Sequence, residues 1–320
     1  MLMNKYAVFT GSCLSAPAIE YLDQAGLLAC VVLPDSDANP DLLQLQQWLE
    51  QKQITMLKYN KKDDKPLIMK LDRMGVECGV IYLFRHKIKT TLIQYFQEHL
   101  VNIHPSPLPD YRGPQPIYWQ LRNGESSTKL TLHKVNEELD CGDIGCEVEI
   151  DIHPFETNKC LHQKMAQALP YLVSQFVQTE QSGGAVWRPQ EQGASLKAAP
   201  QIIHSDLLVD WRQHSAREIA NMARAGNTDV ACALFQYRQS VFQLLQATPV
   251  ECNLVGVKAG TVVQLDKNAG LVVKTDDCAV RLDIIGAQQG VFDGYRFALL
   301  FSLEPGMELC CGANYESRVI

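Results

Sequence analysis

The chain has 320 residues, of which 46% are hydrophobic and 20% are charged, a composition that excludes a largely disordered protein and favours two folded domains. Its 29 Lys and Arg against 36 Asp and Glu give a net charge of −7, which argues against a protein dedicated to coating nucleic acid. No apolar run reaches the ~20 residues of a membrane-spanning helix, and the first residues lack an export signal, so we expect a cytoplasmic protein with no membrane partner.

Short apolar runs alternate with segments of helical periodicity over the first 104 residues. The runs predict strands over residues 6–10, 28–33, 54–57, 78–84 and 100–103, and the periodic segments predict helices over residues 16–25, 42–51, 65–74 and 90–98. Continuous apolar strands that alternate with helices are typical of a sheet covered on both faces. We therefore predict an α/β fold with a Rossmann-like, doubly wound and mostly parallel sheet.

The pattern changes in the second half of the chain. We expect helices over residues 116–122, 158–179 and 215–225, and a half-exposed strand over residues 129–135. Five short apolar runs (231–235, 241–245, 260–263, 271–274 and 280–285) are separated by Gly or Asp turns and predict a small OB-like β-barrel. The predicted division is an α/β domain over 1–189, a linker over 190–205 and the C-terminal barrel domain over 206–320.

The densest polar cluster follows the fifth predicted strand. Asn102 and His104 lie two residues apart, so their side chains share one face of an extended chain. Three prolines at alternate positions follow within residues 105–109 and stiffen the loop, which suits a preorganised site. Farther along, Asp140 lies in a turn beside Gly142. Each feature alone is more typical of a satisfied strand end or an ordinary turn than of a functional site.

Taken together, these residues resemble a known family. The sequence Asn102-Ile-His104, then Ser106-x-Leu-Pro-x-Tyr-Arg-Gly113, and then Leu139-Asp140-x-Gly-Asp143 resembles the signature of 10-formyltetrahydrofolate-dependent formyltransferases. The segments 197–199 and 208–211 and the stretch from residue 260 resemble the C-terminal part of the methionyl-tRNA enzymes in that family. The resemblance covers most of the chain, and it implies the formyltransferase fold with 10-formyltetrahydrofolate as co-substrate.

The resemblance also implies roles for individual residues. Asn102, His104 and Asp140 would be the catalytic residues: an amine attacks the formyl carbon, Asn102 and a protonated His104 donate hydrogen bonds to the anionic oxygen, and Asp140 accepts the proton of the amine. The folate would be bound by four further residues, namely Phe84, Arg85, Ile88 and Leu139. Phe84 and Arg85 stand where family members usually carry small residues.

Other signals point away from a bound metal or a nicotinamide cofactor. Residues 10–13 follow the first strand but lack the spacing G-x-G-x-x-G. The eleven cysteines are odd in number and scattered, which is typical of reduced thiols. Cys141 and Cys146 have no second ligand pair nearby, Cys13 is expected to be a small buried residue, and the pair Cys310-Cys311 is expected to fill a strand, so we expect no metal site.

The charge pattern predicts the kind of acceptor. Methionyl-tRNA formyltransferases carry a basic loop after the second strand, whereas residues 35–41 of this chain hold three acids and no Lys or Arg. Residues 201–320 carry ten Lys and Arg against thirteen Asp and Glu, which disfavours tRNA as a partner. We expect a small amine acceptor, such as an amino sugar, an amino acid or a biosynthetic intermediate. Methionyl-tRNA, hydrolysis of the donor to formate, and folate binding without turnover are the alternatives.

Overall fold

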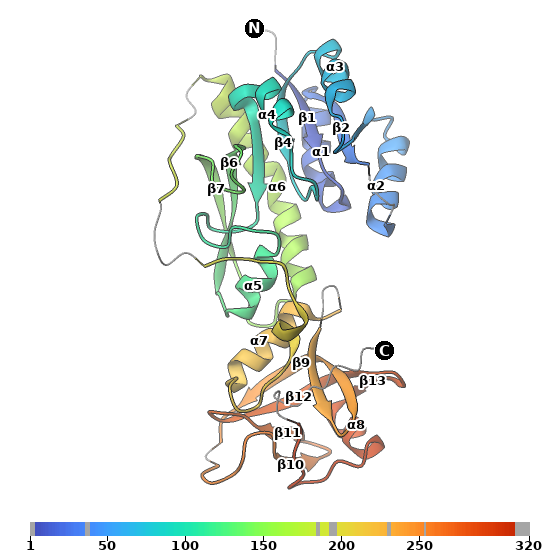
Figure 1. Ribbon diagram of the computed structural model, residues 1–320, viewed down its shortest axis with the longest axis vertical. Helices are drawn as coiled ribbons and strands as arrows, with labels where there is room; N and C mark the ends of the chain where they lie inside the picture. The colour runs from blue at the N-terminus through green and yellow to red at the C-terminus, as the bar shows by residue number, and fades with distance from the viewer. Residues whose placement is uncertain are drawn as a thin grey trace. The chain divides into compact units, whose positions relative to one another are not determined.

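The computed structural model describes residues 4–35, 39–183, 186–191, 197–228, 232–252 and 254–310 (Figure 1). Within it the chain forms two compact units. The first comprises residues 1–116, 127–151 and 162–198, and the second comprises residues 117–126, 152–161 and 199–320. The domain limits expected from the sequence stay a prediction.

A seven-stranded sheet forms the centre of the first unit, in the order β3-β2-β1-β4-β5-β6-β7. Neighbouring strands from β3 to β5 run parallel, and β6 and β7 are antiparallel to their neighbours. The strands are β1 (Lys5–Phe9), β2 (Leu28–Pro34), β3 (Met56–Tyr59), β4 (Val76–Ile81), β5 (Leu100–His104), β6 (Ser127–Lys134) and β7 (Ile144–Asp151). This arrangement confirms the predicted α/β fold with a mostly parallel sheet.

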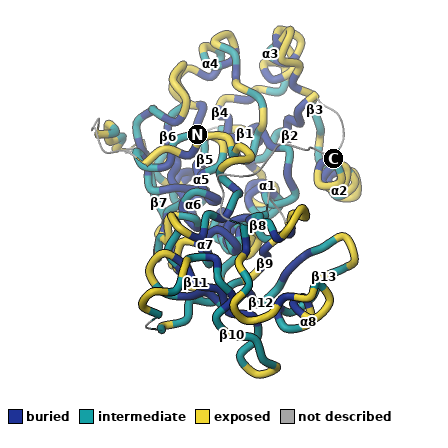
Figure 2. Tube along the Cα trace, turned by 60° about the horizontal axis from the view of Figure 1, so that its bottom comes forward, coloured by how far each residue is buried: buried dark blue, intermediate teal, exposed yellow. Residues whose placement is uncertain are grey.

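The helices follow the strands as the alternating pattern predicts. They are α1 (Ala16–Gln24), α2 (Pro40–Gln51), α3 (Lys65–Arg73), α4 (Thr90–Phe96), α5 (Pro116–Arg122), α6 (Asn158–Gln181), α7 (Ala216–Gly226) and α8 (Gly294–Leu300), with short 3-10 turns η1 (Cys13–Ser15), η2 (Gln97–His99) and η3 (His204–Leu207). The strands β1, β2 and β4 are almost wholly buried, whereas α2 and α3 expose much of their surface (Figure 2). Burial on both faces of the strands explains their continuous apolar runs.

Three strands of the first unit differ from the prediction. The strand expected over 78–84 ends at Ile81, because Leu83 has a left-handed backbone (φ 51°) and its carbonyl accepts a hydrogen bond from Gly11 N–H. The strand expected over 54–57 is shifted to Met56–Tyr59. β7 was not predicted, because its sequence carries acids at Glu147 and Glu149 and it lies at the edge of the sheet, where one strand neighbour suffices.

The second unit contains a six-stranded antiparallel sheet packed against α7 and α8. Its strands are β8 (Ala233–Tyr237), β9 (Ser240–Val250), β10 (Val262–Asp266), β11 (Gly270–Lys274), β12 (Ala279–Ala287) and β13 (Gly290–Asp293). The core between sheet and helices includes Trp211, Phe235 and Phe297, all fully buried. The predicted C-terminal β domain is therefore present, with β13 and α8 in addition to the elements predicted from the sequence.

Some predicted features fall partly outside the described residues. These are residues 36–38 of the acidic segment 35–41, residues 192–196 of the linker 190–205, Ala231 at the start of a predicted strand, and Cys311 of the cysteine pair. In the part of the chain that the structure describes, no helix combines the length and apolar character needed to cross a membrane.

Candidate active site

Asn102 and His104 lie at the carboxyl end of β5, in the middle of the first sheet. The antiparallel register of β5 with β6 pairs Asn102 with His133 and His104 with Thr131. His104 is 5% exposed and His133 is 2% exposed, so both imidazoles are nearly removed from water. The two rings meet edge to face at 6.5 Å between centroids. β6 therefore adds a second histidine to the polar cluster.

Asp140 reaches the same cluster from the loop between β6 and β7. Its Oδ1 lies 3.6 Å from His104 Nδ1 and 3.7 Å from His133 Nε2, while its Oδ2 accepts a hydrogen bond from Gly113 N–H at 3.1 Å. Asp140 itself has a left-handed backbone (φ 56°) and is 7% exposed. The structure thus brings Asn102, His104 and Asp140 together, although 36 residues separate the last two along the chain.

The loop that carries Asp140 is held in place by close packing at Gly142 and by hydrogen bonds from the side chain of Gln190. A Cβ atom at Gly142 would lie 1.9 Å from the carbonyl oxygen of Lys134, so no larger residue fits without moving the loop. Gln190 donates hydrogen bonds from Nε2 to the carbonyl oxygens of Asp140 (2.9 Å) and Gly142 (2.7 Å). Arg112 in turn donates to Gln190 Oε1 from Nε at 3.1 Å and from Nη2 at 2.5 Å. Arg112 and Gln190 therefore clamp the turn that presents the carboxylate.

The proline-rich loop after β5 is also tied to the sheet. Thr131 Oγ1 donates to the carbonyl oxygen of Ser106 at 2.6 Å, and Ser106 Oγ donates to that of Asp110 at 2.7 Å. The loop places the carbonyl oxygen of Tyr111 2.9 Å from His104 Nε2. A carbonyl oxygen only accepts, so Nε2 of His104 carries a proton. Its other nitrogen, Nδ1, faces Asp140.

The hydrogen bonds of His133 also show which of its ring nitrogens carries a proton. Its Nδ1 lies 2.8 Å from the carbonyl oxygen of Lys134, so Nδ1–H donates there. Burial, followed by the nearby His104, lowers the pKa of His133 to about 4, so the ring is neutral at pH 7. Its Nε2 is therefore an acceptor, and it accepts from Asn102 Nδ2 at 3.1 Å. This contact orients the Asn102 amide with its nitrogen toward His133 and leaves one N–H of that nitrogen for another acceptor.

With this geometry established, the chain can be compared with known proteins. Residues 6–177 match the family described as formyl transferase, and residues 201–291 match the formyl transferase C-terminal domain. The chain belongs to the formyl transferase family. It is a formyltransferase that uses a formyl-tetrahydrofolate donor.

Individual relatives give a more detailed comparison with this formyltransferase. A methionyl-tRNA formyltransferase of Pseudothermotoga lettingae is 32% identical over 210 residues, which are 65% of this chain and 67% of the relative. The structure of an N-formyltransferase from Helicobacter canadensis, complexed with folinic acid and dTDP-3-aminofucose, has a TM-score of 0.64 at 16% identity, over 91% of this chain and all of the other. HypX from Aquifex aeolicus, complexed with tetrahydrofolic acid, has a TM-score of 0.59 at 15% identity over 92% of this chain. This chain spans 46% of that HypX chain.

The four predicted folate residues of the formyltransferase lie in two loops. Phe84 contacts Phe9 and Tyr59 edge to face, with ring centroids at 5.9 and 5.6 Å, and Ile88 is buried in the same core. Arg85 is exposed, and Leu139, next to Asp140, is 61% exposed. The roles of these residues stay a prediction.

Sequence reasoning missed His133 and Gln190, and it gave no role in this site to Arg112, although Arg112 belongs to the family signature. His133 sits in an alternating strand pattern that looks ordinary by itself, and only the pairing register of β5 with β6 could have revealed its position. Within the described residues, no group of three or more His, Cys, Asp or Glu side chains could hold a metal ion. Cys146 is an inert thiol, since burial raises its pKa to about 12.

Proposed function

We propose that this formyltransferase transfers the formyl group of 10-formyltetrahydrofolate to the primary amine of a small molecule, such as an amino sugar, an amino acid or a biosynthetic intermediate. The observation that carries the choice of acceptor is electrostatic. The C-terminal third, residues 201–320, has three more acids than bases, whereas a surface that grips tRNA gains its affinity from surplus cations.

The chemical step follows from the three converging side chains. Attack of the amine on the formyl carbon moves negative charge onto the formyl oxygen. Asn102 carries the N–H group for that oxygen, because its nitrogen is oriented by neutral His133 and has a second hydrogen free of that contact. Donors fixed before the reaction need no reorganisation as charge develops.

His104 and Asp140 form the proton-handling pair. His104 Nε2–H is engaged by the carbonyl of Tyr111, so Nδ1 is the nitrogen that faces Asp140 and the reacting groups. The separation of 3.6 Å between Nδ1 and Oδ1 exceeds a normal hydrogen bond and leaves both atoms able to take a new partner. We assign to Asp140 the acceptance of the amine proton, directly or through water, and to a protonated His104 the donation of a second hydrogen bond to the oxygen. The bond between the formyl carbon and N10 of the donor then breaks, and the proton that Asp140 received passes to N10, so that tetrahydrofolate leaves as a neutral amine.

Residues 84–88, which we call the donor loop, carry side chains that fit a flat polar heterocycle. Phe84 and His86 supply aromatic rings whose centroids are 5.9 Å apart. His86 Nε2 is buried and has no hydrogen-bond partner among the described residues, an arrangement that a ligand N–H or carbonyl could complete. Ile88 supplies apolar surface behind them. The pterin of the donor has both the flat shape and the polar edge that this loop requires.

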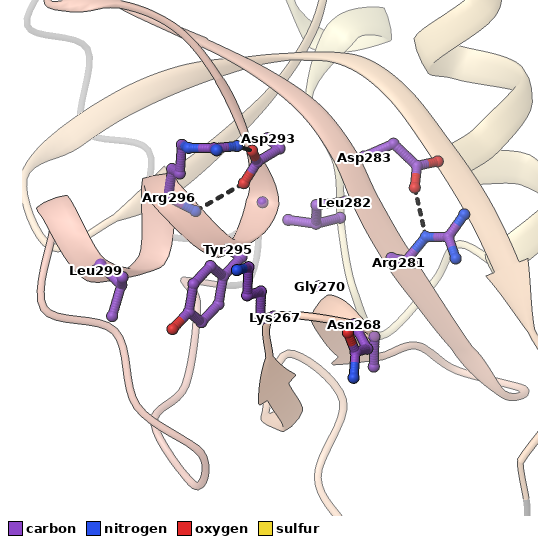
Figure 3. Close-up of a pocket in the computed structure, with 12 residues that line it drawn as sticks. Lys267, Asn268, Gly270, Arg281, Leu282, Asp283, Asp293, Tyr295, Arg296 and Leu299 are labelled. Atoms are coloured by element: carbon purple, nitrogen blue, oxygen red, sulfur yellow. Dashed lines mark hydrogen bonds and ion pairs between the residues drawn. The ribbon is translucent and has the colours of Figure 1, made fainter.

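The C-terminal unit supports a small acceptor rather than tRNA. Its cavity of about 500 Å³ is lined by three cations, Lys267, Arg281 and Arg296. Arg281 is paired with Asp283 and Arg296 with Asp293, as Figure 3 shows, so two of the three cations are already neutralised by carboxylates. Phosphates of a polynucleotide would have to compete with these carboxylates. The Helicobacter canadensis relative holds an amino sugar nucleotide, dTDP-3-aminofucose, which is an acceptor of the proposed class.

Methionyl-tRNA is the second candidate, because curated relatives of the chain, including the one from Pseudothermotoga lettingae, are methionyl-tRNA formyltransferases. Release of tetrahydrofolate from 10-formyltetrahydrofolate separates the candidates when it is measured without amine, with a panel of small amines including amino sugar nucleotides, and with charged methionyl-tRNA. Release that depends on a small amine supports the proposal. Release only with methionyl-tRNA overturns it, and equal release without any amine identifies a hydrolase.

A further inference from the structure

Two cysteines of the second unit lie side by side. Cys252 follows the end of β9 and Cys278 precedes the start of β12, and these two strands pair with Val250 opposite Ala279. The register therefore places the two cysteines at one end of the same ladder. Their Sγ atoms are 3.9 Å apart, and both residues are partly buried free thiols. Because the S–S bond of a disulfide is about 2 Å long, the two sulfurs have to approach each other by about 2 Å to be joined.

The turn that carries Cys278 is fixed by its own hydrogen bonds. Cys278 donates from its backbone N–H to Thr275 Oγ1 at 3.2 Å, and its carbonyl oxygen accepts from Thr275 N–H at 3.1 Å. Asp277 in the same turn accepts at Oδ1 from the backbone N–H of Ala216, the first residue of α7, at 2.9 Å. The turn thus holds Cys278 in one place relative to β12 and α7.

Hydrogen bonds to the sulfur of Cys278 keep Cys252 beside it. The backbone N–H of Cys252 donates to Cys278 Sγ at 3.0 Å. The thiol of Cys278 in turn lies 3.0 Å from the carbonyl oxygen of Val250 and 3.4 Å from that of Cys252. Cys252 lies beyond the last residue of β9 and is not part of the ladder between β9 and β12. A shift of its side chain toward Cys278 therefore leaves the ladder in place.

The groups beside the pair act on its ionisation in opposite directions. Burial, followed by the hydrogen bond with Cys278, raises the pKa of Cys252, whereas the nearby ammonium of Lys274 lowers it. Lys274 is 7% exposed, and its Nζ donates to the carbonyl oxygen of Thr275 at 2.6 Å, which keeps this cation in the neighbourhood of the thiols. The thiolate is the form that attacks a disulfide, so oxidation of the pair should become faster as the pH rises above 7.

We propose that Cys252 and Cys278 are an oxidative modification site, at which a reversible disulfide forms within the second unit. The oxidant is a small-molecule disulfide such as oxidised glutathione. The thiolate of one cysteine attacks it, forms a mixed disulfide and releases one small thiol. The other cysteine, after losing its proton, attacks the protein sulfur of the mixed disulfide and releases the second small thiol. The two cysteines thus lose two electrons and two protons, and the small disulfide takes up both to become two thiols.

The disulfide changes the stability of the second unit. It closes a loop of the chain that contains β10 and β11, since both strands lie between Cys252 and Cys278. A covalent link of this kind removes conformational freedom from the unfolded chain and thereby favours the folded one. We expect oxidation to raise the midpoint temperature of unfolding by roughly 5–10 °C. This effect does not depend on the proposed function, because it concerns the fold of the unit and not the reaction.

The test treats the folded full chain with oxidised glutathione at about pH 8, blocks the remaining thiols by alkylation and maps the peptides by mass spectrometry. We expect a peptide that joins Cys252 to Cys278, a loss of two hydrogen atoms from the chain, and complete reversal by dithiothreitol. The variants Cys252→Ser and Cys278→Ser should each stop at a glutathione adduct on the remaining thiol. The control variant Cys13→Ser/Cys160→Ser removes two other thiols, which are not fully buried, and should form the link as readily as the unmodified protein.

Other patterns of linkage overturn the inference. A folded protein that gains only glutathione adducts, or a link from either cysteine to a different thiol such as Cys310, would show that Cys252 and Cys278 do not react with each other. A link that forms only in denaturant would show that the native fold keeps the two sulfurs apart. If the link forms in the folded protein but calorimetry finds the same unfolding midpoint before and after oxidation, the stabilising effect is refuted.

Discussion

Replacing His133 with Ala tests whether this residue acts by orienting Asn102. The bond from Asn102 Nδ2 to His133 Nε2, at 3.1 Å, holds the amide in one of its two orientations. A buried hydrogen bond has a net value of about 1 kcal/mol, so its loss should make the productive orientation roughly 5- to 10-fold less favoured. Because the amide has two orientations, the productive share falls from about 85–90% to about half when the two become equal in energy, so we expect kcat to fall about twofold, with little change in the KM of the donor.

The double variant makes this prediction specific. In the background Asn102→Ala there is no amide to orient, so adding His133→Ala should cause no further loss of rate. Steady-state release of tetrahydrofolate measures all four proteins, and denaturant unfolding confirms that each is folded. His99→Ala is the matched control, because His99 is half-exposed and forms an ion pair with Glu180 at 3.3 Å. Equal fractional losses from His133→Ala in both backgrounds would show that His133 acts in some other way.

The remaining predictions concern the same cluster. Asn102→Ala should lower kcat by ~10²–10³, the usual cost of losing one donor to a developing oxyanion, and a loss below tenfold would remove it from that role. His104→Ala and Asp140→Ala should each abolish most turnover while calorimetry still detects folate binding, and a near-normal rate in either would refute its assignment. Between pH 7 and pH 5 the folded protein should lose about 2 kcal/mol of stability through His133, because its depressed pKa makes the unfolded chain bind more protons in that range. Denaturant unfolding should show a smaller loss in His133→Gln, and an identical loss would contradict the assignment. Gly142→Ala should displace the turn that carries Asp140 and reduce both stability and kcat, whereas unchanged kinetics would show that the close approach to Lys134 is unimportant.

The sequence was most informative where chemistry and local pattern coincide. Apolar runs between helical segments predicted the strands β1, β2 and β5, because a strand buried on both faces has few polar residues. Asn102 and His104 interrupt this pattern at the end of such a strand, and polar residues at that position are a signal of function. The resemblance to the family then connected them with Asp140, whose turn carries no such signal by itself.

The features that sequence reasoning missed depend on contacts between distant segments. β7 carries alternating acids, and its place at the sheet edge depends on pairing with β6. Gln190 reaches the Asp140 turn across 50 residues, and nothing near Gln190 in the sequence marks it as part of a site. Side-chain register and long-range hydrogen bonds are set by the whole fold, so a local pattern cannot reveal them.

The charges of the loop that we assign to the donor differ from those of the cavity in the second unit. Arg85, Lys87 and Lys89 lie in or directly after the loop that we assign to the donor, whereas Arg281 and Arg296 of the cavity near Tyr295 are paired with acids. The proposed reacting centre is different again, since it contains one carboxylate, one amide and two buried imidazoles. Because His133 is neutral at pH 7, the carboxylate of Asp140 is left to serve His104 and, in the proposed mechanism, the incoming amine. A second cationic imidazole would compete for that carboxylate and would turn an N–H toward Asn102 where an acceptor is needed. The low pKa of His133 is thus a requirement of the mechanism as well as a consequence of burial.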